Sequence, residues 1–367
     1  MNSRRPRAAL SAALAVIVTG ACPLTAASDP VISGILQTRL DAAWQDGAAE
    51  DYTVGLEEYA SLRLKAAAGD RGTVYAAVNL VAASGSCASD GLAGNSLIAG
   101  DNYAAAIEVE RLYAKIQGRT TDVEGGLLRI PFGYGQAFRP TDFLNPPNPL
   151  LPDARPRAVL GGTLALYPAD TSKLRAFAAM GTDPGTSDGG GASFGLSGDI
   201  NTERLSSQAL YAYQAPSSTA PDGIHRGGFS AKLEAGAAFV ADVMYSWDGG
   251  ELVGFGGLRA SMGIDYSVLG GDLYLLGQYL YNGPRLLERG TLPRTNYLYG
   301  LILYRFDDYT SATLSALAGL DDESCAPSMG VERELFQGCT AGMSFRMAFD
   351  SWNPSSASAA LTVRMRF

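Results

Sequence analysis

Apolar and polar residues alternate along most of the chain, in segments separated by turn residues. Between residues 53 and 67, for example, Val54, Leu56 and Leu62 fall on one face of an extended strand, and Glu57 and Arg63 fall on the other. Period-two alternation predicts a strand with one apolar and one polar face. The segments are about 9–15 residues long, which is the length a tilted strand needs to cross a bilayer.

About eighteen segments fit this description, and they predict an all-β protein built as a transmembrane antiparallel β-barrel. Two are weak: 191–199 is rich in Gly and Ser, and 324–334 contains Pro327. An antiparallel barrel needs an even count, so sixteen strands is the alternative. The predicted strands are 31–44, 53–67, 72–83, 103–116, 121–132, 158–168, 172–182, 191–199, 205–214, 226–235, 237–247, 254–268, 272–282, 296–306, 309–320, 324–334, 338–349 and 357–367.

The connections between these segments alternate in length. Tight links are expected at 69–72, 118–119, 169–170, 270–271 and 307–308. Longer segments lie between them, at 84–101, 133–157, 183–190, 215–225 and 283–295. Short turns on one side and long loops on the other are typical of outer-membrane barrels, whereas a soluble sandwich has more even turns and a polar outer face.

The last strand carries a more specific signal. Leu361, Val363, Met365 and Phe367 share one face, and Phe367 is the final residue. This strand resembles the terminal targeting strand of bacterial outer-membrane β-barrels. The resemblance implies that Phe367 is part of an assembly signal, with the barrel-assembly machinery and outer-membrane lipid as partners.

The N-terminal residues predict export. A basic stretch with Arg4, Arg5 and Arg7 precedes the apolar residues 8–21, and small residues follow up to Ala27. We therefore expect a signal peptide at 1–27, a barrel at 28–367 and a location in the bacterial outer membrane. Lipidation at Cys22 is the alternative, because Gly20 and Ala21 precede it, although an aliphatic residue is usual where Thr19 stands.

Composition excludes several other classes. A net charge of −9 disfavours nucleic acid as a partner, and a mean hydropathy near zero fits neither a helical membrane protein nor a disordered chain. Three cysteines would remain after cleavage at Ala27, so no disulfide framework is expected; Cys325 and Cys339 are placed at opposite ends of neighbouring strands.

No enzymatic centre is expected from these residues. The chain has a single histidine, His225, which the sequence places in a solvated loop, and no nucleophile motif stands out. No clustered His or Cys predicts a metal site, and no phosphate-binding motif predicts a cofactor. We therefore expect no catalytic, metal or cofactor residues.

A proline-rich segment after the fifth predicted strand is the most distinctive local feature. Six prolines between 140 and 156 remove ladder donors and stiffen the backbone. The residues that carry a family resemblance are Gly133-Tyr134-Gly135-Gln136 and Phe138-Arg139-Pro140-Thr141-Asp142-Phe143-Leu144-Asn145-Pro146. They resemble a loop of outer-membrane β-barrel proteins of the porin and alginate-exporter type.

In such barrels a long loop often folds inward and narrows the pore. The resemblance implies a pore constriction that includes Arg139, Asp142, Arg155 and Arg157. The alternative is that Arg139 and Asp142 pair with each other, or with strand ends, and only hold the loop in place.

Charged residues on the polar faces of the strands are expected to line a wet lumen, because their burial in a dry core would be costly. Their mixed signs disfavour strong ion selectivity, and they could equally do no more than make the lumen polar. A β-bulge near Glu110 and Arg111 would bring the charges of that strand to one face. The main set is Arg39, Asp41, Arg63, Lys65, Arg129, Arg305, Arg346, Arg364 and Arg366; the wider set adds Glu57, Glu108, Glu110, Arg175, Lys232, Glu234 and Asp242.

The function expected from these features is that of an outer-membrane porin, a channel for diffusion of small hydrophilic solutes. The alternatives are an adhesin-like surface protein whose long loops bind an external partner, and a secreted or lipid-anchored soluble β protein. The sequence names neither the solute nor the oligomeric state, nor whether the lumen is open or plugged.

Overall fold

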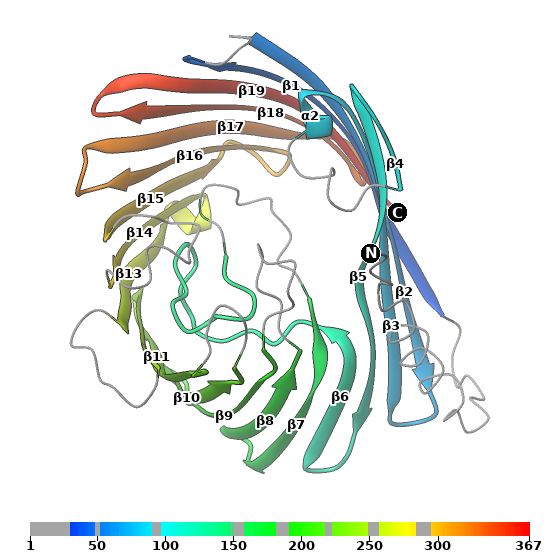
Figure 1. Ribbon diagram of the computed structural model, residues 1–367, viewed down its shortest axis with the longest axis vertical. Coiled ribbons are helices and arrows are strands. Elements are labelled where there is room, and N and C mark those ends of the chain that lie inside the picture. The colour runs from blue at the N-terminus through cyan, green and yellow to red at the C-terminus, as the bar shows by residue number, and fades with distance from the viewer. Residues whose placement is uncertain are drawn as a thin grey trace, which may run out of the picture.

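The chain forms one closed antiparallel β-barrel (Figure 1). The computed structural model describes residues 30–47, 52–89, 97–147, 149, 158–180, 191–216, 222–248, 257–283 and 295–367. All nineteen strands of this part belong to one sheet. Eighteen of them form the ring, and the three-residue strand β4 lies beside β5 without completing it.

The strands of the ring differ in length around the wall. The strand bounds are β1 (Val31–Gln45), β2 (Tyr52–Ala68), β3 (Gly72–Gly85), β4 (Ile98–Gly100), β5 (Tyr103–Gln117), β6 (Thr121–Leu128), β7 (Val159–Ala169), β8 (Ser172–Ala179), β9 (Ser193–Asn201), β10 (Leu205–Gln214), β11 (Ile224–Ala235), β12 (Ala237–Trp247), β13 (Leu258–Val268), β14 (Leu273–Asn282), β15 (Asn296–Arg305), β16 (Thr310–Gly319), β17 (Ser324–Phe336), β18 (Cys339–Asp350) and β19 (Asn353–Arg366). Short helical turns are α2 (Ser86–Ser89) and η2 (Leu269–Gly271). The shortest strands of the ring are β6 and β8, with eight residues each, and the chain leaves the wall for the interior after β6.

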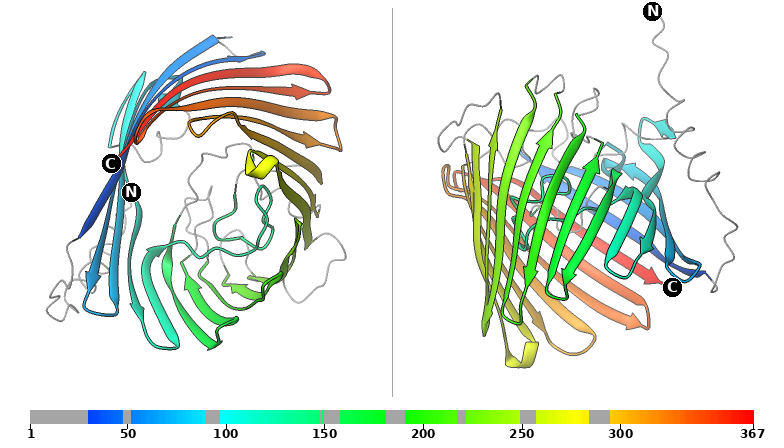
Figure 2. Two further views of the ribbon diagram at one scale, coloured as in Figure 1. Left: turned by 180° about the vertical axis from the view of Figure 1, so that it is seen from behind. Right: turned by 90° about the horizontal axis from the view of Figure 1, so that it is seen from below.

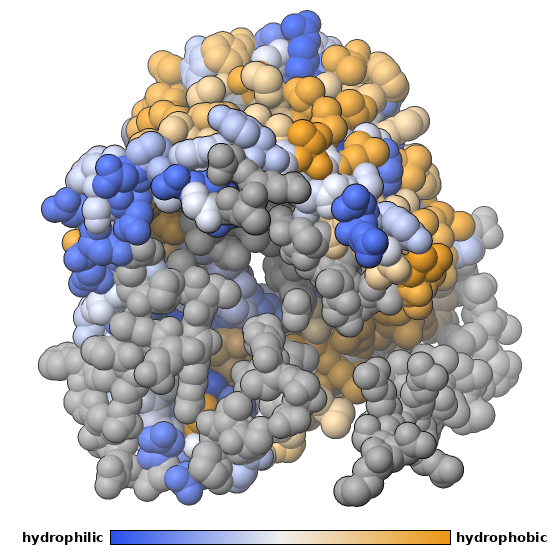
Figure 3. Space-filling view, turned by 45° about the horizontal axis from the view of Figure 1, so that its top comes forward, coloured by the Kyte–Doolittle hydropathy of each residue, from blue (hydrophilic) through white to orange (hydrophobic). Residues whose placement is uncertain are grey.

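The alternation in the sequence becomes an inner and an outer face. Large apolar side chains such as Leu36, Leu62 and Phe345 are exposed on the outside of the ring. Figure 3 shows apolar side chains gathered over the outer strands in view. Polar residues at the intervening positions point inward, where Asn79 and Asp242 are buried. This is the two-faced pattern expected of strands with apolar residues outside and polar residues inside.

The barrel closes by pairing its first strand with its last. β1 and β19 are antiparallel over Ile35–Gln45 and Ser356–Arg366, and Gly34 and Phe367 exchange both backbone hydrogen bonds, at 2.8 and 3.2 Å. The Phe367 ring lies over Gly34, which has no side chain to oppose it. Figure 2 shows these strands side by side in two views.

The predicted fold is confirmed, including its two weakest strands. Residues 193–201 and 324–336 are both strands, so the ring has eighteen members and the sixteen-strand alternative is wrong. The expected β-bulge is also present: Ala77 pairs with Arg111 and Val78 with Val109, which leaves Glu110 as the extra residue. The short elements β4 and α2 were not predicted.

Two local expectations are corrected by the structure. The strand expected over 121–132 ends at Leu128, because the Ile130 N–H donates to the Asn145 side chain at 3.1 Å instead of to a neighbouring strand. His225 lies in β11 and not in a loop, on the outer face, where its ring stacks on Trp247 at 5.4 Å.

The signal peptide and Cys22 lie outside the described residues. Cys87, Cys325 and Cys339 are free thiols, and Cys325 pairs with Phe349, at the other end of β18 from Cys339. Among the described residues, no helix has both the length and the apolar character needed to cross a membrane.

Candidate functional site

The candidate site is an inward segment, residues 129–147, that leaves the wall after β6 and lies inside the ring (Figure 1). It has no regular secondary structure, so its backbone needs other partners. Gly133 and Gly135 permit its tight folding and its close approach to the wall: a Cβ at Gly133 would collide with the Thr141 hydroxyl within the segment, and one at Gly135 would lie 2.7 Å from Asp242 Oδ2 and from Gln278 Nε2 of the wall. Gly133 also has a positive φ of 79°, which few other residues adopt without strain.

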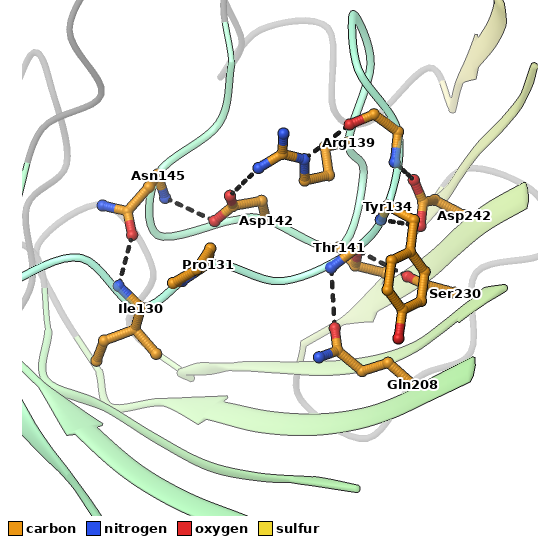
Figure 4. Close-up of polar contacts among 12 residues, drawn as sticks. Ile130, Pro131, Tyr134, Arg139, Thr141, Asp142, Asn145, Gln208, Ser230 and Asp242 are labelled. Carbon is orange, nitrogen blue, oxygen red and sulfur yellow. Dashed lines mark hydrogen bonds and ion pairs between the residues drawn. The ribbon is translucent and has the colours of Figure 1, made fainter. Parts of the chain in front are cut away.

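Polar side chains of the barrel wall fasten the backbone of this segment. Gln208 of β10 accepts a hydrogen bond from the Gly133 N–H at 2.9 Å. Asp242 of β12 accepts from the N–H groups of Tyr134 and Gly135, at 3.2 and 2.8 Å (Figure 4). These two side chains therefore hold three consecutive backbone donors that no strand could pair.

The fastening continues on β11 and β14. The hydroxyls of Thr141 and Ser230 lie 3.0 Å apart. The Gln278 Oε1 accepts from the N–H groups of residues 136, 137 and 138, at 3.3, 3.0 and 3.2 Å. Asp242 and Gln278 are 0 % and 2 % exposed. Because an unpaired buried N–H costs free energy, the removal of either acceptor would weaken the attachment of the segment.

Apolar contacts hold the segment at two places. Phe132 stacks on Phe143 with centroids 5.9 Å apart and contacts Phe177 of β8 at 5.0 Å. Toward the other side of the lumen, Phe138 packs near Tyr297 and Tyr299 of β15. The segment therefore extends from an apolar contact with β8 to another apolar contact with β15.

Two wall arginines support the aromatic stack. The Arg175 guanidinium lies 4.6 Å from the Phe132 ring centroid and donates to the Pro131 carbonyl at 3.1 Å. The Arg226 guanidinium lies 4.8 Å from the Phe143 ring centroid. Both are cation–π contacts, so these arginines help to position the segment.

Arg139 and Asp142 form an ion pair within the segment. Arg139 Nη1 lies 3.3 Å from Asp142 Oδ2, and the side chains are 28 % and 1 % exposed. Arg139 Nε also donates to the Gly135 carbonyl at 2.9 Å, and Asp142 Oδ1 accepts from the Asn145 N–H at 3.1 Å. Burial raises the pKa of Asp142 to about 7, against the opposing effect of the Arg139 charge.

The other predicted constriction residues, Arg155 and Arg157, lie outside the described residues. The structure thus brings Arg139 and Asp142 into contact, as in the alternative that they hold the segment in place. Whether the segment also sets the pore's narrowest point stays a prediction.

The predicted lumen charges on the strands lie at inward positions of the wall, and several are paired; Arg129 lies just past β6, at the start of the inward segment. Arg39 pairs with Asp41 at 2.7 Å, and Arg129 pairs with the bulged Glu110 at 2.9 Å. Arg364 of β19 donates to the side chain of Gln37 at 3.0 Å. Four further residues of the set alternate with outward apolar residues along their strands: Arg63 and Lys65 on β2, Arg305 on β15 and Arg346 on β18, while Arg366 ends β19.

Sequence reasoning missed the wall residues that fasten the segment, except that Asp242 and Arg175 were expected to point inward. Gln208, Ser230 and Gln278 are polar residues at inward strand positions, like many others in the chain. Their burial was the missing information. Among the described residues, no three His, Cys, Asp or Glu side chains converge as metal ligands would.

The geometry can be compared with known proteins. No family model matches the chain, and no curated protein matches it in sequence. Solved structures of Occ outer-membrane channels match its fold. OccAB4 of Acinetobacter baumannii is 11 % identical with a TM-score of 0.61, covering 94 % of this chain and 100 % of its own.

Two further structures agree with this result. OccK9 (OpdG) of Pseudomonas aeruginosa is 13 % identical with a TM-score of 0.63, over 92 % of this chain and 98 % of its own. OpdQ of the same organism is 14 % identical with a TM-score of 0.59, over 92 % and 97 %. The chain therefore has the eighteen-stranded barrel fold of these outer-membrane channels.

Proposed function

We propose that the protein is a channel of the bacterial outer membrane through which small hydrophilic solutes diffuse, and that the inward segment sets the narrowest part of the passage. The outer face is apolar and faces lipid, and the inner face carries charged residues that water solvates. The solved Occ channels have the same fold, which supports the proposal.

One observation carries the proposal most directly: the inward segment is fastened to the inner wall. Its contacts to Gln208, Asp242 and Gln278 keep it inside the ring. A loop whose only role was to bind an external partner would gain nothing from three buried acceptors in the lumen. A segment that limits passage needs such fixed attachment, because its position determines the free cross-section.

Single-channel recording of the refolded protein in a planar bilayer tests the proposal. We expect stable current steps from protein that shows the heat-dependent gel mobility of a folded barrel. The control is the same preparation after heat unfolding, which should give no steps. Folded barrel without current would contradict the channel and favour the surface protein whose loops bind an external partner.

A further inference from the structure

The Arg139–Asp142 pair places opposite charges in unequal surroundings. The Asp142 side chain is buried, with 1 % exposed, whereas 28 % of the Arg139 side chain is exposed. Any change of charge on Asp142 is therefore hidden from solutes, but it alters how much of the Arg139 charge is compensated. A single contact of 3.3 Å joins the two side chains.

We propose that this pair is a charge switch for the passage: when Asp142 takes up a proton, Arg139 loses its countercharge and the passage favours anions more. The inference rests on the proposed channel function and adds to it a dependence of selectivity on pH. Ionised Asp142 leaves the pair neutral, and protonated Asp142 leaves it with one positive charge.

The direction and range of the switch follow from the surroundings of Asp142. Burial disfavours the carboxylate and raises its pKa from 3.8 to about 7, so the proton is taken up near neutral pH. Because the folded-state pKa is raised, the protonated form is the one that the fold favours. Acidification therefore leaves the segment attached while it changes the charge.

Other charged groups near the pair do not remove this effect. Within the segment Arg139 is the direct partner, and Arg175 of β8 also acts on Asp142 electrostatically. Asp242 of β12 interacts electrostatically with Arg139, and its carboxylate accepts hydrogen bonds from the N–H groups of Tyr134 and Gly135. Asp199 of β9 faces Arg175, and Arg226 of β11 lies over the Phe143 ring.

The attachment of the segment does not depend on the ion pair. The hydrogen bonds that Gln208 and Gln278 accept from backbone N–H groups of the segment involve no titrating group. A change in selectivity without a large change in conductance is therefore the expected signature. A gate that opened or closed would change conductance instead.

The test is the anion-to-cation permeability ratio, measured from reversal potentials in a salt gradient at about pH 8.5 and about pH 5.5, on either side of the pKa of about 7. We expect the wild-type ratio to rise about two- to fourfold on acidification, as estimated for one elementary charge roughly 10 Å from the ion in water. His225, the only histidine of the chain, lies on the outer face and is present in every variant.

Two variants separate the roles of the pair. Asp142→Asn should hold the high ratio at both pH values, because residue 142 then carries no charge to compensate Arg139 at either pH. Arg139→Gln should hold a low ratio at both values, because a buried carboxylate without its countercharge stays protonated. Asp265→Asn, which removes a partly exposed lumen carboxylate near Gln136, is the matched control and should keep the wild-type response to pH.

The outcomes separate this inference from the proposed channel. A folded wild type without current contradicts the channel itself. A conducting wild type with the same ratio at both pH values, or an Asp142→Asn variant that responds as the wild type does, overturns the charge switch alone. If Asp142→Asn fails to fold, Arg139→Gln still decides the matter, since an unchanged response to pH in that variant contradicts the proposal.

Discussion

Single residues determine how closely the inward segment can approach the wall. At Gly135 the backbone passes against Asp242 and the side chain of Gln278, with no room for a Cβ. At Gly277, on the outer face of β14, a Cβ would meet nothing within 4 Å. A Gly-to-Ala substitution would therefore be crowded at Gly135 and unhindered at Gly277.

We expect Gly135→Ala to destabilise the attached segment by about 1–3 kcal/mol, as overpacking typically does. Recordings should show current fluctuations that the wild type lacks, because the segment would leave its position more often. Gly277→Ala is the control and should behave as the wild type. Quiet wild-type currents in Gly135→Ala would contradict the close packing described here.

The two faces of a strand give a second residue-scale prediction. Phe345 is exposed on the outer face of β18, and Ser344 beside it points inward. Phe345→Arg should lower the free energy of unfolding by about 2–4 kcal/mol, because the charge would lie in hydrocarbon. Ser344→Arg should be nearly neutral. Denaturant unfolding in lipid vesicles measures both, and equal effects would rule out this phase of the strand.

The sequence could predict these faces but not the anchors. Alternation is a local property, so Val54, Leu62 and Phe345 reveal their face from a few neighbours. The contact from Gln278 to Phe138 joins residues 140 positions apart. An inward glutamine in a wet lumen looks the same in sequence whether it contacts water or a folded-in segment.

At the scale of elements, turn residues and alternation predicted all eighteen strands of the ring. The error at the end of β6 has a physical cause. Buried and more exposed side chains continue to alternate over residues 129–132. Instead of pairing with a neighbouring strand, however, this stretch bonds to the Asn145 side chain through the Ile130 N–H and stacks Phe132 on Phe143. Only tertiary contacts that are distant in sequence could reveal that ending. β4 and α2 were missed because three- and four-residue elements show no period.

The last strand is the element with the sharpest expectation. Phe367 pairs with Gly34 at the closure of the ring, and its ring covers that glycine. Deletion of Phe367, or Phe367→Asp, should therefore reduce insertion into the outer membrane and leave precursor in the periplasm. Cell fractionation with gel mobility before and after heating measures this. The exposed Trp352, at the tip of the β18–β19 turn, offers a control in Trp352→Asp; undiminished folded barrel without Phe367 would contradict the assembly role.

At the scale of the whole molecule, the barrel and its inward segment form one device. The wall supplies side-chain acceptors on β10, β12 and β14, and backbone N–H groups of the segment donate hydrogen bonds to them. The resulting structure keeps irregular backbone inside the ring without leaving those donors unpaired. This arrangement is what the channel proposal requires of a fixed constriction.

The conductance of a shortened variant tests this account most directly. Replacing residues 139–156 by a short glycine-containing link removes the Arg139–Asp142 pair and the Phe143 contact, while residues 133–138 keep their anchors. We predict that the folded variant conducts more than the folded wild type under the same salt and voltage. Equal or lower conductance in the shortened barrel would contradict the claim that this segment sets the narrowest point.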